Sequence, residues 1–502
     1  MRTIRHHVDR QAQERPDAPY LIAPETGRTL SYRRLRDDSL RLARDLQAAG
    51  LAPGATVSLM MGNGYQTARL FIGAMYAGYV VQPVNLLAQD SVLAYVLEHS
   101  DSRLVFAAHE FAPRLRAIVA RMPRLPAIVE VDPDAEQPFD VPAATPADLA
   151  PVGEDDDALL MYTSGTTGVP KGCMLTHRNV VAGGEFTSAA HRLGPGDRVL
   201  CALPLYHING QIVTAVAPLV HGGSVVMPRR FSASSYWPCV AAYRCTWINV
   251  VPTIISYLLD GADSASAGLD ISRVKFCRSA SAPLPPELQR AFEQRFGIGI
   301  IETFGMTETA APCFSNPYER ERRKPGSPGM AFGNEAKIVD TASGATLPAG
   351  RPGEIMVRGD NVMRAYYKDP ATTARTLEPD GWLHSGDLGY LDADGFLFVT
   401  GRLKELIIKG GENIAPREID EALLRHPAVL EAAAVGIPDR HYGQDIMACV
   451  VLKPGARCEV ERLYEFSREQ LGGYKAPRLI KIVDALPKGP SGKVQRLKLL
   501  ET

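Results

Sequence analysis

Apolar side chains recur along the chain with two alternating periods. Ser31 opens a segment in which they return every three or four residues, which predicts an amphipathic helix that ends at Gly50. The apolar positions are Tyr32, Leu35, Leu42, Ala43, Leu46 and Ala49. Short apolar runs follow, such as "ATVSLMM", "RLVFAA", "RVLCALPL", "WINVVPT" and "VKFCRSA", and each leads into a helical or turn segment. This alternation is typical of an α/β fold.

The pattern changes from Gly353 onward. Strand-like runs become frequent and are separated by turns rich in glycine and aspartate, as in "GEIMVRG", "GYLDADGFLFVTGR" and "ELIIKGGENI". A helix opened by Pro416, the strands "AAAVGI" and "IMACVVL", and a helix around residues 463–471 come next. We therefore expect roughly the last hundred residues to form a small separate α+β domain.

Length and composition narrow the class of protein. With 502 residues, of which 45% are hydrophobic, the chain is expected to form two or more domains. The 55 Lys and Arg residues balance 56 Asp and Glu, which argues against a general nucleic-acid or polybasic membrane surface and favours a small-molecule partner. The N-terminus is charged throughout and lacks the apolar core of a signal peptide, so a cytoplasmic protein is expected. The longest apolar stretch, from Leu70, is interrupted by glycines and a proline and predicts a buried helix followed by a strand.

Cysteine spacing gives no sign of a metal site or a disulfide framework. The eight cysteines form no C-x-x-C pair, and no histidine lies at zinc-finger spacing. Reduced and mostly buried thiols are therefore expected.

The stretch "YTSGTTGVPKG", from Tyr162 to Gly172, is rich in donors of hydrogen bonds. It follows an apolar run and precedes Thr176, a suitable N-cap, so it is expected to be a strand-to-helix loop. It lacks the G-K-[ST] of a Walker A motif, because Gly172 follows Lys171. Its hydroxyls, glycines and lysine suit a polyphosphate, although an ordinary polar turn is the simpler alternative.

Several motifs in order resemble the adenylate-forming superfamily of acyl-CoA synthetases, firefly luciferases and adenylation domains of peptide synthetases. They are "YTSGTTGVPKG", "PLYHING", "SASAPLP", "ETFGMTET", "GWLHSGDLG", "GRLKELIIKGGENI" and "PKGPSGK". The resemblance covers nearly the whole chain and implies a large N-terminal domain of layered α/β subdomains over residues 1–403. A small mobile α+β domain would follow over residues 404–502, with Lys404 as the hinge. ATP and coenzyme A would be the cosubstrates, and Mg²⁺ would be the metal.

The resemblance also implies roles for individual residues. Phe304 would stack on adenine, Thr307 would contact the phosphate of the adenylate and Glu308 would bind Mg²⁺, roles that suit these residue types. Asp387 would accept from the ribose hydroxyls, and Arg402 would contact ribose or phosphate. The implied ATP-binding set is Thr163, Ser164, Gly165, Thr166, Thr167, Lys171, Ala280, Ser281, Ala282, Thr303, Phe304, Asp387 and Arg402. The family commonly has glycine at Ala280 and often at Ser281, so these side chains either narrow the acyl pocket or shift the backbone.

The catalytic set implied in the same way comprises Lys493, Thr307, Glu308 and His207. Lys493 would bridge the carboxylate and the α-phosphate during adenylation, because an ammonium there stabilises the charge that builds on the attacked phosphate. Gly410, Gly411 and Glu412 resemble the loop that lines the pantetheine tunnel, and Lys475 would contact a phosphate of coenzyme A. A simple surface lysine is an equally good explanation for Lys475.

The acyl group is harder to assign from the sequence. Amino-acid-activating relatives have an aspartate at the position of His207, so an α-amino acid is not expected. The sequence is most similar here to bacterial acyl-CoA and crotonobetaine/carnitine-type CoA ligases. The side chains that would face the acyl group are Tyr206, His207, Trp247, Val251, Ala280 and Thr303.

The predicted activity is therefore AMP-forming carboxylate:CoA ligase. An adenylation enzyme that loads the phosphopantetheine of an acyl carrier protein is the alternative. A luciferase-like monooxygenase and a nucleotide-binding protein without catalysis are less favoured, and the sequence leaves monomer and homodimer both open.

Overall fold

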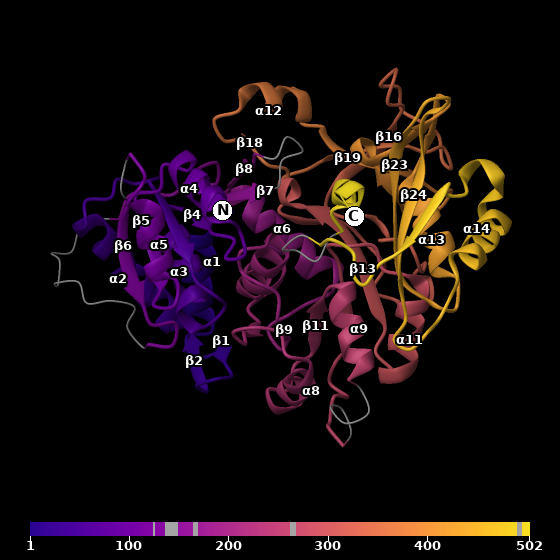
Figure 1. Cartoon of the computed structure of the whole chain (residues 1–502). Helices are drawn as coiled ribbons and strands as arrows, with labels where there is room; N and C mark the ends of the chain where they lie inside the picture. Colours follow the sequence, from indigo (N-terminus) through magenta and orange to yellow (C-terminus); the bar gives the residue numbers. More distant parts are fainter. Residues whose placement is uncertain (124–125, 136–148, 164–168, 262–267, 489–493, 502) are drawn as a thin grey trace. The chain divides into compact units, whose positions relative to one another are not determined.

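The computed structural model describes residues 1–502 except 124–125, 136–148, 164–168, 262–267, 489–493 and 502 (Figure 1). The chain divides into two compact units. The first comprises Met1–Glu335 and Val357–Leu383, and the second comprises Ala336–Met356 and His384–Thr502. The predicted α/β class is confirmed, with a large N-terminal and a smaller C-terminal domain. All residues from 404 onward belong to the second unit, while the boundary at residue 404 itself stays a prediction.

The first unit contains a mainly parallel sheet of seven strands, in the order β18-β8-β7-β4-β3-β5-β6. The strands are β3 (Thr56–Met60), β4 (Val80–Pro83), β5 (Leu104–Ala108), β6 (Ala127–Val131), β7 (Asp157–Thr163), β8 (Lys171–Thr176) and β18 (Ala365–Tyr366). Helices α4 (Asp90–His99) and α5 (Ala112–Val119) share one apolar core with this sheet. Helix α3 (Tyr65–Tyr76) contacts β3 and β4 and also β1 (Pro19–Ala23) of a second sheet, so it lies between the two sheets.

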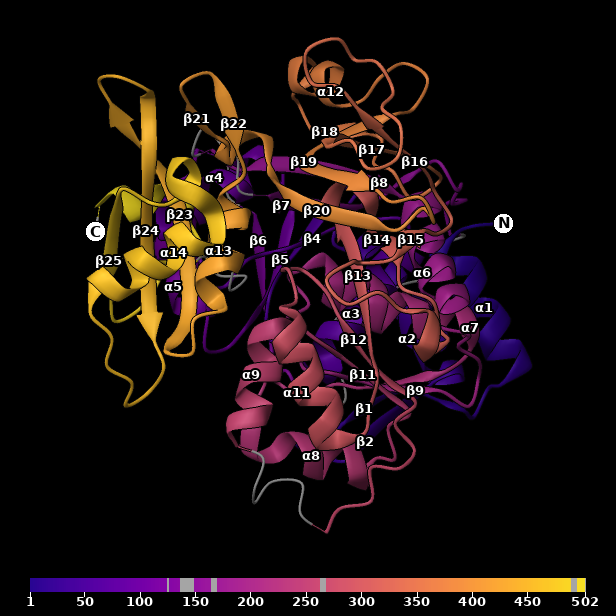
Figure 2. The ribbon, with the colours of Figure 1, turned by 90° about the vertical axis from the view of Figure 1, so that its right-hand side faces the viewer.

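The second sheet of this unit has nine strands, in the order β15-β14-β13-β12-β11-β9-β10-β1-β2. The others are β2 (Arg28–Ser31), β9 (Arg198–Cys201), β10 (Ser224–Val226), β11 (Trp247–Val250), β12 (Phe276–Ser279), β13 (Ile300–Met306), β14 (Ala311–Ser315) and β15 (Met330–Ala331). Helices α8 (Ala233–Ala242), α9 (Pro252–Asp260) and α11 (Pro286–Phe296) cover one face of β11–β13 through a shared apolar core, and they group on one side of these strands in Figure 2. Further helices are α1 (Ile4–Glu14), α2 (Tyr32–Ala48), α6 (His177–Ala190), the π-helix η1 (Asn209–Val216), α7 (Ala217–His221) and α12 (Pro370–Thr376).

The second unit contains two sheets, apart from a few strand ends of the four-stranded one, which belong to the first unit. One is a four-stranded sheet of β16 (Glu335–Val339), β17 (Gly353–Arg358), β19 (Leu383–Leu391) and β20 (Leu397–Arg402). The other has five strands, β21 (Ile407–Lys409), β22 (Glu412–Ile414), β23 (Val429–Asp439), β24 (Gly443–Leu452) and β25 (Leu479–Ile482). In this five-stranded sheet β25 pairs parallel with β24, and the pairs β21–β22, β21–β24 and β23–β24 are antiparallel. Helices α13 (Pro416–Leu424) and α14 (Val460–Lys475) pack on it through Ile419, Leu423 and Leu463. This confirms the α+β character expected for the end of the chain.

The predicted helix from Ser31 is confirmed, except that Ala49 is an exposed C-cap residue rather than part of the buried face. The Ser31 hydroxyl accepts from the Arg34 amide and caps α2, while Gly50 has φ +79° just beyond its end. The predicted loop before Thr176 is partly wrong. Thr176 does cap α6, but residues 171–176 form strand β8, which pairs antiparallel with β7. The motif therefore joins two strands of a hairpin rather than a strand and a helix.

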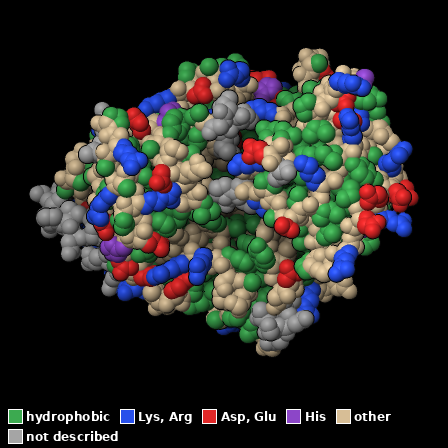
Figure 3. All heavy atoms as spheres, viewed as in Figure 1, with side chains coloured by type: hydrophobic (Ala, Val, Ile, Leu, Met, Phe, Trp, Pro, Cys, Tyr) green, Lys and Arg blue, Asp and Glu red, His purple; other side chains and the backbone are tan. Residues whose placement is uncertain are grey.

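The distribution of charged side chains and the state of the cysteines agree with the expectations from the amino-acid composition. Lys and Arg side chains are interspersed with Asp and Glu on the face shown in Figure 3, as the net charge of −1 suggests. All eight cysteines are free; only Cys239 and Cys458 are partly exposed, and the other six are buried. Among the described residues, no helix is both long and apolar enough to cross a membrane.

Three buried histidines, together with the half-buried His221, are expected to make the first unit sensitive to acid. Burial lowers the pKa of His7 and His191 to about 3 and that of His177 and His221 to about 4. The unfolded chain, with histidine pKa values of about 6.5, binds more protons than the folded one below that pH. Stability should thus fall as the pH drops from about 6.5 toward 4, by roughly 1 kcal/mol per histidine at about pH 5.5.

Thermal unfolding followed from neutral to acidic pH tests this expectation. His221→Asn removes one titrating group and should make the fall in Tm less steep. An unchanged Tm of the original chain down to about pH 5 would contradict the buried, neutral state of these side chains.

Candidate active site

The ends of the predicted phosphate loop are held by the β7–β8 hairpin. Tyr162 pairs with Gly172 and Thr163 with Lys171, so the loop starts and finishes at neighbouring backbone positions. The Lys171 ammonium lies 5.2 Å from the centroid of the Tyr366 ring. Ser164, Gly165, Thr166 and Thr167 lie outside the described residues, and their roles stay predictions.

Glu308 is positioned by a residue that the sequence analysis did not single out. Thr307 and Glu308 form the short 3-10 helix η2 (Thr307–Thr309) directly after β13. The Tyr366 hydroxyl donates to Glu308 Oε1 at 2.8 Å, and the Met363 amide donates to the Glu308 carbonyl. Burial, followed by the Glu308 charge, raises the pKa of Tyr366, which keeps this hydroxyl protonated and able to donate. Lys171, Tyr366 and Glu308 are thus brought together from three distant parts of the sequence.

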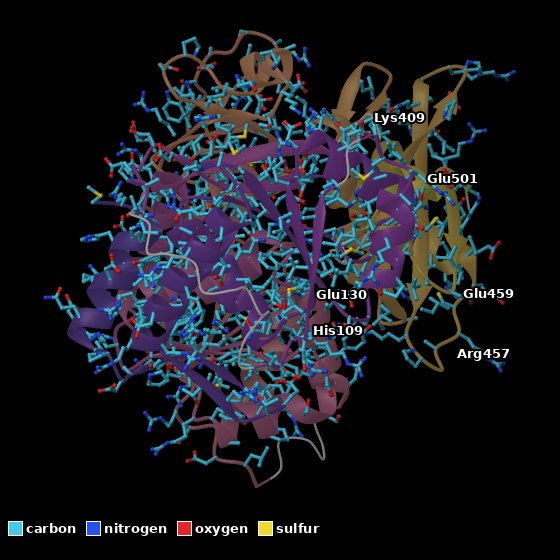
Figure 4. The ribbon with its side chains drawn as sticks, turned by 90° about the vertical axis from the view of Figure 1, so that its left-hand side faces the viewer. His109, Glu130, Lys409, Arg457, Glu459 and Glu501 are labelled. Carbon is cyan, nitrogen blue, oxygen red and sulfur yellow. The ribbon has the colours of Figure 1, made fainter. Side chains whose placement is uncertain are left out.

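The chemistry of Glu308 fits its predicted role toward Mg²⁺. Its half-buried carboxylate supplies hard oxygen atoms, and Mg²⁺ is commonly held by one or two carboxylates together with phosphate oxygens and water. Within the described part of the chain, no three His, Cys, Asp or Glu side chains gather as a metal cage. His109 and Glu130, side by side in Figure 4, form an exposed pair. Arg116 also pairs with Glu130, and the positive charge of Arg116 disfavours a cation there.

Phe304 and Thr303 lie on β13 ahead of Glu308. The half-buried Phe304 ring packs edge-on against Phe314, with 6.0 Å between centroids, which fixes its plane. Thr303 is buried, and its hydroxyl has no hydrogen-bond partner among the described residues. A buried hydroxyl without a partner is costly, so it is a natural contact for a ligand.

Ala280 and Ser281, the two residues of "SASAPLP" at which the family often has glycine, differ in backbone conformation. Ala280 is buried and does not have a positive φ, whereas Ser281 has φ +73°, in the region that favours glycine. The Asn209 amide donates to the Ser281 hydroxyl at 3.1 Å. Ser281 therefore combines a strained backbone conformation with a side-chain hydrogen bond that a glycine could not make. The next residue, Ala282, is half-buried.

Ser281 variants are expected to separate these two effects. Ser281→Gly and Ser281→Ala both remove the hydroxyl, but only glycine relieves the positive φ. The glycine variant should therefore be more stable than the alanine variant by about 1 kcal/mol, measured by urea unfolding. An alanine variant of equal or higher stability would contradict the strained conformation.

The predicted acyl-facing residues divide between half-buried and buried positions. Tyr206 and His207 are half-buried with rings 4.9 Å apart, and Val251 is also half-buried. Trp247 is fully buried and stacks on His191. The π-helix η1 begins two residues after His207, a geometry that is frequent at functional sites.

In the second unit, Asp387 and Arg402 are direct partners. They face each other across β19 and β20, and Arg402 Nε donates to Asp387 Oδ1 at 3.0 Å. Asp387 is buried while Arg402 is exposed, so the arginine stabilises the ionised carboxylate that a ribose contact needs.

The predicted coenzyme A loop is a tight turn between β21 and β22. Gly410 and Gly411 have φ +57° and +86°, and the exposed Glu412 begins β22. Lys409, labelled in Figure 4, directly precedes this turn. Its buried ammonium donates to Asp445 at 2.6 Å and to the Tyr474 carbonyl at 2.9 Å, which anchors the end of β21.

The remaining lysines of the prediction have different surroundings. The Lys475 ammonium lies 2.8 Å from Glu418, so it is a surface ion-pair residue whose role toward coenzyme A is untested. Lys404 is exposed in the short helix η4 (Leu403–Glu405). Lys493 lies outside the described residues.

Comparison with known proteins decides the family. The model for AMP-binding enzymes matches residues 8–367, and the model for the AMP-binding enzyme C-terminal domain matches residues 418–493. The chain is an AMP-binding enzyme. The first matched region contains Lys171, Thr307 and Glu308. The second begins within helix α13 and ends at residue 493.

Individual relatives of this AMP-binding enzyme are CoA ligases. It is 55% identical to a sulfoacetate–CoA ligase of Cupriavidus necator over 493 residues, 98% of this chain and 96% of that one. It is 35% identical to an oxalate–CoA ligase of Arabidopsis thaliana, covering 93% and 92% of the two chains. The crystal structure of ATP-bound MatB from Rhodopseudomonas palustris matches with a TM-score of 0.91 at 30% identity, over 99% of this chain and 98% of that one.

These relationships confirm the predicted activity. The AMP-binding enzyme is an AMP-forming CoA ligase that uses ATP to activate a carboxylic acid and then transfers the acyl group to coenzyme A. The individual site residues stay predictions, supported by the contacts described above.

Proposed function

We propose that the acid activated by this ligase is sulfoacetate, a two-carbon acid with a sulfonate at the end opposite the carboxylate. The observation that carries the proposal is the 55% identity to a sulfoacetate–CoA ligase over almost the full length of both chains. The oxalate–CoA ligase at 35% identity also acts on a short acid with two anionic groups, which agrees in substrate class.

The proposed reaction has two steps. In the first, a carboxylate oxygen of sulfoacetate attacks the α-phosphate of ATP, forming the acyl–phosphate bond while pyrophosphate leaves. In the second, the thiol of coenzyme A loses its proton, its sulfur attacks the acyl carbonyl and AMP leaves, giving sulfoacetyl-CoA.

Residues of this chain have defined tasks in the first step. Lys171 and the loop before it bind the polyphosphate, while Thr307 and Lys493 stabilise the negative charge that develops on the α-phosphate. Glu308, held by Tyr366, would bind Mg²⁺, which neutralises phosphate charge when bound. Phe304 and Asp387 bind adenine and ribose.

The proposal is tested by measuring AMP release and thioester mass for the purified chain with ATP, Mg²⁺ and coenzyme A. Sulfoacetate is expected to exceed acetate, butyrate and glycine in kcat/KM by about 100-fold or more, because the latter acids lack the second anion. A higher kcat/KM for oxalate or malonate would contradict sulfoacetate as the substrate.

The acyl acceptor needs a second assay with a phosphopantetheinylated carrier protein in place of coenzyme A. Transfer to coenzyme A is expected to be the faster reaction. Faster loading of the carrier protein would support the alternative of an enzyme that supplies an acyl carrier protein.

A further inference from the structure

Arg278 lies on the face of β12 that is turned away from the helices α8, α9 and α11. Successive strand residues point to opposite faces, and Cys277 and its cross-strand partner Ile248 belong to the core beneath those helices. Arg278 and its cross-strand partner Asn249 therefore belong to the other face. His191, which follows α6, stacks on Trp247 and Phe276 of that face, so the arginine is enclosed between the sheet and the α6 layer.

The Arg278 guanidinium is buried with amides as its partners. Only 2% of the residue is exposed. Nη1 donates to Asn209 Oδ1 at 2.7 Å and to Asn249 Oδ1 at 2.8 Å, while Nε is buried without a hydrogen-bond partner. Among the described residues, the partners of this guanidinium are these two amides, and no carboxylate forms an ion pair or hydrogen bond with it.

A buried positive charge without a counter-ion is unfavourable. Burial lowers the pKa of Arg278 to about 9, still above neutral pH, so the side chain stays charged in the folded protein. Buried charges are normally paired, as Arg69 is with Asp38 at 2.9 Å in the same unit. An anion at Arg278 would supply the missing counter-charge and accept from Nε.

The amide network connects Arg278 to both segments that are predicted to face the acyl group. Asn209 follows His207 by two positions and donates to the half-buried Ser281, which follows Ala280. Asn249 also donates to Asn209, so the two amides hold each other in place. A Cβ at Gly210 would lie 2.5 Å from the Pro204 carbonyl, which shows how closely η1 packs onto the "PLYHING" segment.

We propose that Arg278, oriented by Asn209 and Asn249, binds the second anionic group of the acyl substrate. The inference rests on the proposed CoA ligase reaction with a short doubly charged acid, and it assigns the residue that selects for the second charge. When the distal sulfonate or carboxylate is bound to the guanidinium, the carboxylate at the opposite end of the acid remains to react with ATP. A neutral acid of similar size leaves the guanidinium without a counter-ion, which disfavours its binding.

The test compares sulfoacetate, malonate and butyrate on the original enzyme and on Arg278→Met. The variant is expected to lose about 100-fold or more in kcat/KM for the doubly charged acid that the original enzyme uses best, but less than about tenfold for butyrate. Arg278→Lys should recover part of the loss, because the charge remains without the planar fork. Equal losses for charged and neutral acids would overturn the proposal.

Asn249→Asp provides an independent variant that is expected to fold. The new carboxylate would accept from Arg278 at the place of the present amide oxygen, so Tm should be unchanged or higher while use of the doubly charged acid falls selectively. An Asn249→Asp enzyme with undiminished preference for that acid would overturn the proposal. Arg69→Lys is the matched control, since it alters a buried arginine that already has a carboxylate, and it should leave the substrate preference unchanged.

The outcomes separate this inference from the choice of sulfoacetate. If the original enzyme prefers malonate and Arg278→Met loses malonate selectively, sulfoacetate is wrong and the role of Arg278 is supported. If the original enzyme uses butyrate as well as any doubly charged acid, the role of Arg278 is overturned.

Discussion

Lys493→Ala is expected to slow acyl-AMP formation by about 100-fold or more without disturbing the fold. In the family resemblance this ammonium contacts both the attacking carboxylate and the α-phosphate, where negative charge builds in the transition state. Loss of one such donor typically costs about 3 to 4 kcal/mol of transition-state stabilisation. Pyrophosphate release, measured with saturating acid, reports this step directly.

Lys488 of the same "PKGPSGK" segment offers the control. Its ammonium pairs with Glu431 at 2.8 Å, so Lys488→Ala removes a partly exposed ion pair and should retain most of the activity. The Lys493→Ala protein should also still convert supplied acyl-AMP to the thioester, because the lysine acts on the phosphate step. Near-normal pyrophosphate release by a folded Lys493→Ala enzyme would show that the assignment is wrong.

Glu308→Gln is expected to lower adenylation by about 100-fold or more and to raise the Mg²⁺ concentration that is needed. The amide can still accept from Tyr366 but lacks the charge that a divalent cation requires. In Tyr366→Phe, by contrast, the Glu308 carboxylate keeps its charge but loses the hydrogen bond from the Tyr366 hydroxyl. Its effect should be only about fivefold to tenfold, corresponding to one hydrogen bond of about 1 kcal/mol.

Glu287→Gln is the control for a general charge effect. Glu287 is exposed on α11, pairs only with Arg290 among the described ion pairs, and should tolerate the change. A Mg²⁺ dependence that shifts equally in Glu287→Gln and Glu308→Gln would contradict the assignment of Glu308 to the metal.

Local patterns predicted the regular elements well where side-chain periodicity and end signals agree. For α2, the period of the apolar face, the Ser31 cap and the glycine beyond it all indicate the same boundaries. Strand β8 was missed because its residues begin within a motif rich in glycine and proline, and its pairing with β7 is a contact that no local pattern contains. Tertiary pairing decided the structure of that segment.

The predicted site residues divide in the same way. Thr307 and Glu308 were predicted as site residues because they share one short motif, whereas Tyr366 contacts Glu308 across 58 positions of sequence and carries no motif of its own. Arg278 was not singled out, because it is one of two charged residues, with Lys275, in the strand-like run "VKFCRSA". Its meaning depends on amides from η1 and β11, which only the folded chain brings to it.

The burial of the thiols has a consequence for an enzyme that makes an acylating agent. An acyl-AMP or a thioester transfers its acyl group readily to any thiolate within reach, so an accessible cysteine would become acylated in place of coenzyme A. Burial, together with the charge of Glu308, raises the pKa of Cys173, the thiol on β8 that immediately follows the Lys171–Gly172 end of the loop. Burial likewise raises the pKa of Cys201 to about 11. These sulfur atoms stay protonated and enclosed, which protects the enzyme from modification by its own intermediate.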